Sequence, residues 1–298
     1  MRAYYEVKFD LEFKTQTGTQ FQELFTGVMQ RRYPGDFQKV KPYGNQGDKK
    51  CDGFQSSVGR VYQVYAPEQM NSRTTLSKIN EDLRGALGHW QKKMKEWTFV
   101  HNQYRGLPPD VVIRLEFLKK CKTLKIDHWC DTELREIFFQ LHPADQAALL
   151  GPAPTPQSVM RIEMDDIINV VKAIAQQSAP ISEEVGQVPP GKLEANALSS
   201  SVKDLLILGS RKSRLVKQFF SEWNDPLLGD RVAASFRVKY GLLKAEGKVG
   251  DEIFLELWRY AGVSKHASMS QESAVLALLA FLFEECEIFE PAPMEEKS

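Results

Sequence analysis

Two stretches rich in proline, glycine and serine interrupt this 298-residue chain and limit how it can fold. They read GPAPTPQ at residues 151–157 and QQSAPISEEVGQVPPGKLEANALSSS at residues 176–201. Such composition is typical of loops and linkers, because proline and glycine interrupt regular structure and the stretches are poor in aromatic side chains. We therefore predict an N-terminal domain at residues 1–150, a linker with one helix at residues 151–200, and a C-terminal domain at residues 201–298.

The residues before the first stretch alternate between helical and strand patterns. Expected helices are residues 17–30, 74–94, 110–121 and 131–141, and expected strands are residues 36–44, 52–59, 60–66, 96–103 and 123–130. Three successive strands followed by helical crossovers predict a mixed sheet flanked by helices, which is an α/β domain.

The residues after the second stretch have helical spacing almost throughout. Expected helices are residues 202–223, 231–247, 251–262 and 272–290, with Asp230, Asp251 and Ser270 as expected N-caps. The segment AVLALLAFLF is apolar nearly all round, which predicts the buried central helix of an all-α domain.

Several protein classes are excluded or disfavoured by simple patterns. No run reaches the roughly 18 apolar residues that span a bilayer, and the start MRAYYEVKFDLEF lacks the apolar stretch of a secretory signal. We therefore expect a cytoplasmic protein without membrane contact. The four cysteines show no paired spacing of a zinc ribbon, a redox motif or a disulfide framework. Motifs of Walker ATPases, dinucleotide enzymes, zincins and α/β-hydrolases are absent.

The zero net charge hides a difference between the two halves. Residues 1–150 contain 23 Lys and Arg against 18 Asp and Glu, a balance of +5, and the remainder has 39−23=16 against 39−18=21, a balance of −5. This asymmetry suggests different partners for the two parts.

The segment GDKKCDGFQSSVGRVYQVYAPE, residues 47–68, combines a turn aspartate with a polar strand. Hydrolysis of a phosphodiester needs Mg²⁺ or Mn²⁺ to polarise the phosphoryl oxygen, and such ions prefer oxygen ligands. Asp52 offers a carboxylate, Gln63 offers an amide oxygen, and Glu23 on the first expected helix offers a second carboxylate. Strand alternation puts Gln63 and Tyr65 on one face. These residues are the predicted metal and catalytic site.

The order helix, three strands, helix, strand resembles the PD-(D/E)XK superfamily of nucleases, which implies a restriction-endonuclease-like fold and a Mg²⁺-dependent deoxyribonuclease. In this resemblance Glu23 matches the first-helix acid, Asp52 the motif aspartate and Gln63 the second motif position. The family lysine that follows is replaced here by Tyr65.

A phenol with a pKa near 10 cannot supply the positive charge of that lysine. Either Lys49, Lys50 or Lys78 replaces it as a catalytic residue, or the domain has lost hydrolysis and kept binding.

The segments GDKKCDGF and YQVYAPE are similar to the N-terminal part of effector proteins of bacterial anti-phage systems, including the ABC-three-component group. The tail FLFEECEIFEPAP is similar to the end of their C-terminal domains. The resemblance implies DNA as substrate and partner subunits such as an SMC-like or ABC-type ATPase.

Simpler interpretations stay open for each residue. Asp52 and Gln63 also suit an ordinary hairpin, and the polar pairs at residues 101–102 and 127–128 suit core hydrogen bonding as well as a cleft. Basic residues around the long expected helix suit either a solvated surface or a phosphate backbone; they are Arg73, Lys78, Arg84, Lys92, Lys93 and Lys95. The alternatives to a nuclease are a non-catalytic scaffold or sensor that binds nucleic acid or proteins, and an assembly module that forms a homo-oligomer.

Overall fold

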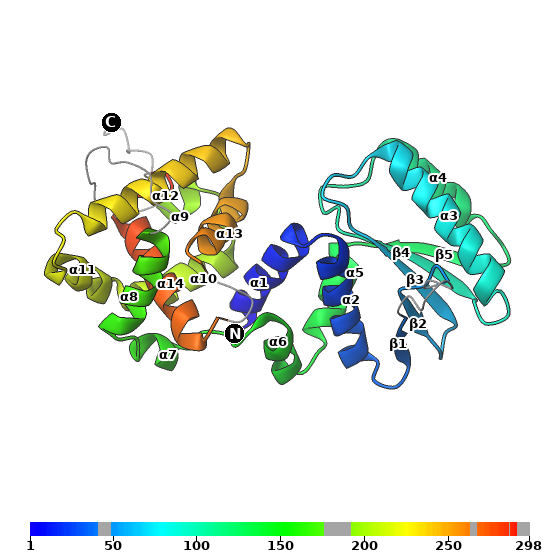
Figure 1. The fold of residues 1–298 in the computed structure, drawn as a ribbon, viewed down its shortest axis with the longest axis horizontal. Coiled ribbons are helices and arrows are strands. Elements are labelled where there is room, and N and C mark those ends of the chain that lie inside the picture. The colour runs from blue at the N-terminus through cyan, green and yellow to red at the C-terminus, as the bar shows by residue number, and fades with distance from the viewer. Residues whose placement is uncertain (41–48, 176–191, 263–266, 286, 291–298) are drawn as a thin grey trace, which may run out of the picture. The chain divides into compact units, whose positions relative to one another are not determined.

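The computed structural model describes residues 1–40, 49–175, 192–262, 267–285 and 287–290 (Figure 1). The chain divides into two units, Phe9–Leu149 and Met1–Lys8 with Leu150–Ser298. The first boundary therefore falls inside the helix α1 (Arg2–Thr15), which the sequence analysis did not predict. The second falls next to the expected break at residue 150. We call Phe9–Leu149 the α/β unit and the remainder the helical unit.

The α/β unit contains all five described strands. After α1, its elements are α2 (Gly18–Arg32), β1 (Phe37–Lys39), β2 (Gly53–Gln55), β3 (Arg60–Tyr65), α3 (Ser72–Trp90), β4 (Glu96–His101), α4 (Pro109–Lys119), β5 (Lys125–Trp129), α5 (Asp131–Phe139) and α6 (Pro143–Leu150).

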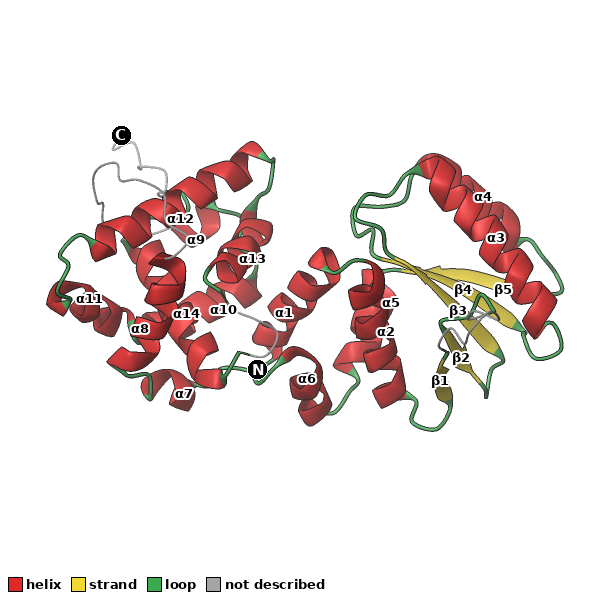
Figure 2. Ribbon diagram, viewed as in Figure 1, coloured by secondary structure: helices red, strands yellow, loops and turns green. Residues whose placement is uncertain are grey.

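The strands form one mixed sheet in the order β1-β2-β3-β4-β5 (Figure 2). β2 is antiparallel to both β1 and β3, whereas β3, β4 and β5 are parallel. Parallel neighbours need a crossover, and α3 and α4 provide the two crossovers. The mixed sheet flanked by helices that the sequence predicts is confirmed.

Side-chain alternation along β3 directs its residues into two apolar layers. Val61 belongs to a buried cluster with Ile79 of α3 and residues of α4. On the opposite face, the ring of Tyr62 lies 5.3 Å from that of Phe25 of α2 and 5.2 Å from that of Trp129. The sheet is thus covered by α3 and α4 on one face and by α2 on the other (Figure 1).

The described residues of the helical unit form helices and no strands. Its helices after α6 are α7 (Pro156–Met160), α8 (Met164–Ala175), α9 (Lys192–Ala195), α10 (Ser200–Ser210), α11 (Ser213–Glu222), α12 (Leu228–Ala245), α13 (Gly250–Tyr260) and α14 (Met269–Glu284). No described helix of the chain is long and apolar enough to cross a membrane.

The helix α14 is the buried centre of this unit, as its apolar sequence predicts. Leu276, Leu279 and Leu282 are each 0% exposed. Gly209 of α10 packs directly on this helix, because a Cβ atom at Gly209 would lie 2.3 Å from the backbone oxygen of Leu276. A side chain at that position would force the two helices apart.

A buried ion pair joins the start of the chain to α14 within the helical unit. Lys8 Nζ lies 2.9 Å from Glu272 Oε1, and both side chains are 2% exposed. Trp258 Nε1 donates to the second carboxylate oxygen at 3.0 Å. Burial raises the pKa of Glu272, while the Lys8 ammonium acts in the opposite direction.

Helix ends depart from the sequence predictions in three places. The expected helix 202–223 is two helices, α10 and α11. The N-cap of α14 is Ser268, two residues before the expected Ser270. Asp230 and Asp251 lie inside the first turns of α12 and α13 rather than at their N-caps. Acidic residues are favourable in a first turn as well as at a cap, so their presence locates a helix start only to within a few residues.

Candidate functional site

The carboxylate of Asp52 lies where β2 ends beside β3. Gly53 pairs with Tyr62, and the Asp52 N–H also donates to the Tyr62 oxygen at 2.9 Å, so the ladder register breaks at Asp52, as in a β-bulge, and does not place Asp52 opposite Gln63. Asp52 Oδ2 accepts the Val64 N–H at 2.7 Å. The residue is 6% exposed. The Asp52 side chain thus accepts the β3 amide hydrogen that a backbone oxygen of β2 would otherwise accept, and it lies against the Gln63–Val64 peptide.

The first helix supplies an amide to this carboxylate. Gln22 Nε2 of α2 donates to Asp52 Oδ1 at 2.5 Å. Glu23, the predicted first-helix acid, is exposed. Successive residues of a helix point about 100° apart, so a shift of one position replaces the predicted carboxylate with the neighbouring amide.

Gln63 and Tyr65 point to the α3 and α4 face of the sheet, because they alternate with Val61 of the cluster on that face. Gln63 is 3% exposed, and its Oε1 accepts no hydrogen bond from the described part of the chain. The Tyr65 ring packs against the same cluster, 6.1 Å from that of Phe99. The buried amide oxygen is an acceptor available to a cation or a water molecule.

Two of the three lysines expected to replace the family lysine converge on one carboxylate. Lys50 Nζ lies 3.2 Å from Asp82 Oδ1 and 2.6 Å from Glu81 Oε1. Lys78 Nζ lies 2.9 Å from Asp82 Oδ2. The hydrogen bond to Glu81 is the main reason why the pKa of Lys50 is raised. Lys49 is exposed, and its backbone oxygen accepts the Trp90 Nε1–H at 3.2 Å.

Asp82 is a residue that the sequence analysis missed. Its side chain is 0% exposed on α3, where its neighbours Ile79 and Leu83 belong to the buried cluster beneath the helix. An acidic residue next to an apolar helical stripe is the signal that could have identified it, because such a residue is rarely buried without a partner.

The turn before Asp52 has an unusual backbone. Lys49 and Lys50 have φ values of 54° and 57°, in the left-handed region. This conformation costs non-glycine residues about 1–2 kcal/mol each. The turn directs the Lys50 side chain toward α3, and such strain is typical of functional loops.

Two histidines lie near the carboxyl ends of the parallel strands. The His101 and His128 rings lie 5.9 Å apart. His101 Nδ1 accepts the Gln103 N–H, so the neutral ring carries its proton on Nε2, which has no acceptor among the described residues. Burial lowers the pKa of His101 to about 3 and also lowers that of His128. Both rings are therefore neutral near pH 7 and do not supply the missing positive charge.

The donor atoms of the site suit a hard cation. The described residues contain no group of three His, Cys, Asp or Glu side chains that could hold a metal ion. Mg²⁺, however, commonly takes one or two carboxylates and completes its shell with water and phosphate oxygens. Asp52 offers carboxylate oxygens, and Gln63 Oε1 accepts no hydrogen bond from the described residues. Each oxygen by itself is of the type that Mg²⁺ or Mn²⁺ prefers, but Gln63 points to the α3 and α4 face whereas the Asp52 carboxylate is bonded to α2, which covers the other face, so the structure does not bring these two predicted ligands together.

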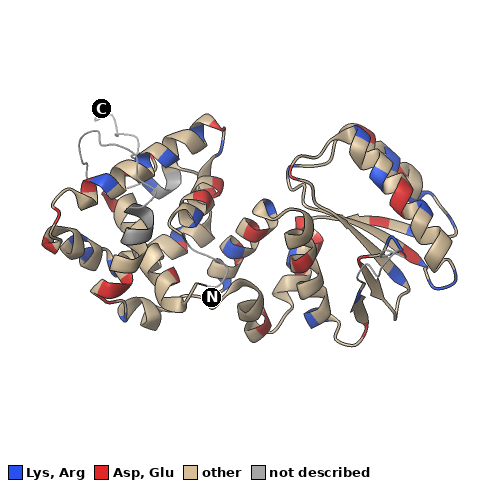
Figure 3. Cartoon of the chain, viewed as in Figure 1, with Lys and Arg blue, Asp and Glu red and all other residues tan. Residues whose placement is uncertain are grey.

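Basic side chains are frequent on α3 and the loop that follows it (Figure 3). Lys92, Lys93 and Lys95 are exposed there, as are Arg73 and Arg84 on the helix. Their positions agree with the phosphate-tracking surface that the sequence suggested, and an ordinary solvated helix would look the same.

The structure defines a chain with a mixed α/β unit and an all-helical unit. Residues 165–290, which lie in the helical unit, match the family model of C-terminal domain 10 of the ABC-three component systems. This match supports the anti-phage defence context that the sequence suggested. No curated protein and no solved structure matches the chain.

Proposed function

We propose that the chain is an effector subunit of a multi-component bacterial anti-phage defence system, and that its α/β unit is a PD-(D/E)XK-like, metal-dependent DNA endonuclease. The family match of residues 165–290 supports the defence context and the presence of partner subunits. The helix, three strands, helix, strand order within the α/β unit supports the nuclease-like assignment.

The observation that carries the nuclease proposal is the position of Asp52. Its carboxylate is fixed by Gln22 of α2 and by the Val64 amide of β3. One helix, one turn and one strand thus meet at a single carboxylate, which supports a role for Asp52. An ordinary hairpin aspartate would bond within its own turn and would not need the helix.

In this proposal Asp52 would hold Mg²⁺ or Mn²⁺ together with water and phosphate oxygens, and the ion would polarise a phosphoryl oxygen and lower the pKa of a bound water. Gln22 orients the Asp52 carboxylate through its amide hydrogen bond. Lys50 is the cation closest in sequence to Asp52, and it stabilises negative charge on the attacked phosphate after exchanging Glu81 or Asp82 for the substrate.

A non-catalytic nuclease-like scaffold or sensor is the second candidate. Three observations favour it. Glu23 is exposed, Tyr65 packs against the apolar cluster, and Lys50 is already paired with Glu81 and Asp82. In this case the unit binds DNA through the basic surface, with affinity that falls as salt rises and does not depend on Mg²⁺.

A matched pair of substitutions separates the two candidates. Asp52→Asn removes the negative charge at nearly constant shape, and Asp36→Asn does the same to a turn aspartate that accepts hydrogen bonds from Ser57 and Gln55 away from the site. The assay is cleavage of supercoiled and linear DNA with Mg²⁺, Mn²⁺ or Ca²⁺, using the full chain together with the proteins encoded beside it.

The nuclease proposal expects cleavage by wild type and Asp36→Asn that depends on Mg²⁺ or Mn²⁺, and a loss of at least about 100-fold in Asp52→Asn. Cleavage that Asp52→Asn retains, or no cleavage by any variant, rejects it. Salt-sensitive DNA binding without cleavage supports the second candidate.

A further inference from the structure

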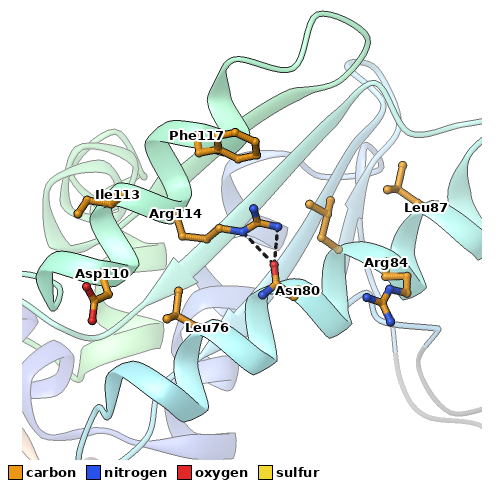
Figure 4. Close-up of a pocket in the computed structure, with 9 residues that line it drawn as sticks. Leu76, Asn80, Arg84, Leu87, Asp110, Ile113, Arg114 and Phe117 are labelled. Carbon is orange, nitrogen blue, oxygen red and sulfur yellow. Dashed lines mark hydrogen bonds between the residues drawn. The ribbon is translucent and has the colours of Figure 1, made fainter.

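An open groove of about 850 Å³ runs between α3 and α4 on the outside of the α/β unit (Figure 4). Its α3 wall is formed by residues at helical spacing, which are Leu76, Asn80, Leu83, Arg84 and Leu87. Its α4 wall is formed by Asp110, Ile113, Arg114 and Phe117. The α3 wall extends from Leu76 to Leu87, which is 11 steps of 1.5 Å, or about 16 Å and about three helical turns.

Large apolar side chains of this groove are exposed to solvent. Ile113 is 68% exposed, Phe117 63% and Leu87 41%. Isolated exposed apolar residues are normal, but several that line one groove mark a binding surface. The described residues of the α/β unit place nothing over them.

The groove also contains two guanidinium groups without a carboxylate partner in the described part of the chain. Arg114 donates from Nε and Nη2 to Asn80 Oδ1 at 2.9 and 2.6 Å, and its guanidinium lies 5.4 Å from the Phe117 ring. Arg84 is exposed and has no ion pair among these residues. Arg114 is therefore held in a fixed orientation toward a neutral partner, so it can pair with an incoming carboxylate without losing a salt bridge.

We propose that this groove binds an acidic amphipathic helix of a partner protein. Three turns of helix place apolar side chains at i, i+4 and i+7 against the leucines of α3 and the exposed residues of α4. A Glu or Asp beside that stripe pairs with Arg84 and Arg114. The proposal concerns binding only and does not depend on nuclease activity.

Nucleic acid fits this groove less well than a helix does. Asp110 lies at one end, and most of the other lining side chains are apolar (Figure 4). A continuous phosphate backbone would meet that carboxylate and leave the leucines exposed. A helix with apolar and acidic residues covers the leucines and neutralises both arginines.

The test uses photocrosslinking in the full chain, expressed with its neighbouring genes. Benzoylphenylalanine replaces Phe117 in the groove or, as a control, Val112, which is 42% exposed on the same helix and does not line the groove. Mass spectrometry identifies the crosslinked peptide. The proposal expects a crosslink at position 117 at least about ten times stronger than at position 112, to a helical segment of another protein with the stated apolar and acidic pattern.

Charge exchange then tests the pairing. Arg84→Glu should weaken the crosslink at least about tenfold, whereas Arg73→Glu, an exposed α3 arginine outside the groove, should leave it unchanged. Changing the facing acid of the partner to Arg should restore the crosslink to Arg84→Glu. A crosslink to nucleic acid, to this chain itself or to a segment without acidic residues overturns the proposal, as do equal crosslinks at both positions or a failure of the charge exchange.

Discussion

Replacing Lys8 with methionine should destabilise the helical unit by about 3–5 kcal/mol, because it leaves a buried carboxylate without its counter-ion. Methionine retains most of the lysine stem, so the loss is mainly electrostatic. Glu272 is the carboxylate left without a counter-ion, since its side chain is 2% exposed and its other hydrogen-bond partners, Trp258 and Tyr4, are neutral. A free energy of this size corresponds to a change of about 150- to 5,000-fold in the ratio of folded to unfolded chains.

The loss should depend on pH. The pKa of Glu272 is already raised by burial in the presence of Lys8, and removal of the ammonium raises it further. A folded-state pKa above the unfolded-state pKa means that the folded state binds the proton more tightly. The loss of stability caused by Lys8→Met is therefore small below about pH 4, where Glu272 is protonated in both the folded and the unfolded state. The loss grows as the pH rises from the unfolded-state pKa toward the folded-state pKa of Glu272.

Hydrogen exchange of α14 measured by mass spectrometry is the assay, because it reports on the helical unit separately from the α/β unit. Amides of residues 269–284 should lose about 150-fold or more of their protection in Lys8→Met at pH 8 and much less near pH 5. Arg2→Met is the control on the same helix. Its partner is Glu6 and its side chain is 79% exposed, so the change should cost less than about 0.5 kcal/mol.

A second variant tests the cause. Lys8→Met combined with Glu272→Gln keeps an acceptor for Trp258 and removes the unpaired charge, so protection should return to within about tenfold of wild type. Unchanged exchange in Lys8→Met, or a double variant as unstable as the single one, would refute the reasoning.

Three further predictions concern other positions. Lys50→Met and Lys78→Met should each lower the free energy of unfolding of the α/β unit by less than about 1.5 kcal/mol, because Asp82 keeps one lysine partner in each. The double variant should lower it by about 3–5 kcal/mol, because this buried aspartate then loses both lysines. Denaturant unfolding measures these changes. Burial holds the pKa of His101 at about 3 in the folded state, so the α/β unit loses stability as the pH falls below the unfolded-state pKa near 6.5, by up to about 5 kcal/mol at pH 3. His101→Gln removes this group, so the variant should unfold at a lower pH than wild type in a circular dichroism titration. An unchanged acid midpoint contradicts this prediction. Gly209→Ala should lower the melting temperature despite the higher helix propensity of alanine, because the added Cβ atom meets the backbone of α14. Gly88→Ala should raise the melting temperature, because a Cβ atom at Gly88 has nothing within 4 Å. Equal effects of the two changes would show that the close contact between α10 and α14 is unimportant.

The predicted features that the structure confirms are those encoded by local periodicity. The alternation of β3 places Gln63 and Tyr65 on one face, and the apolar run of α14 becomes the buried centre of its unit. Both follow from neighbouring residues alone, because a strand repeats every two residues and a buried helix lacks a polar side. The mixed sheet follows from the order of such segments.

Side-chain partners far apart in the chain were decided only by the tertiary structure. The sequence analysis predicted that Glu23 lies at the site, whereas the fold brings its neighbour Gln22 to Asp52. The sequence analysis also did not decide which of three lysines replaces the family lysine, and the fold places two of them, Lys50 and Lys78, beside Asp82.

The pair between Lys8 and Glu272 joins residues 264 positions apart, where the expected domain boundaries would have separated them. Sequence pattern determines which face of an element is apolar, because that depends on a repeat of two to four residues. Which polar side chains meet depends on the register and rotation of packed elements, and these are set by the assembled core.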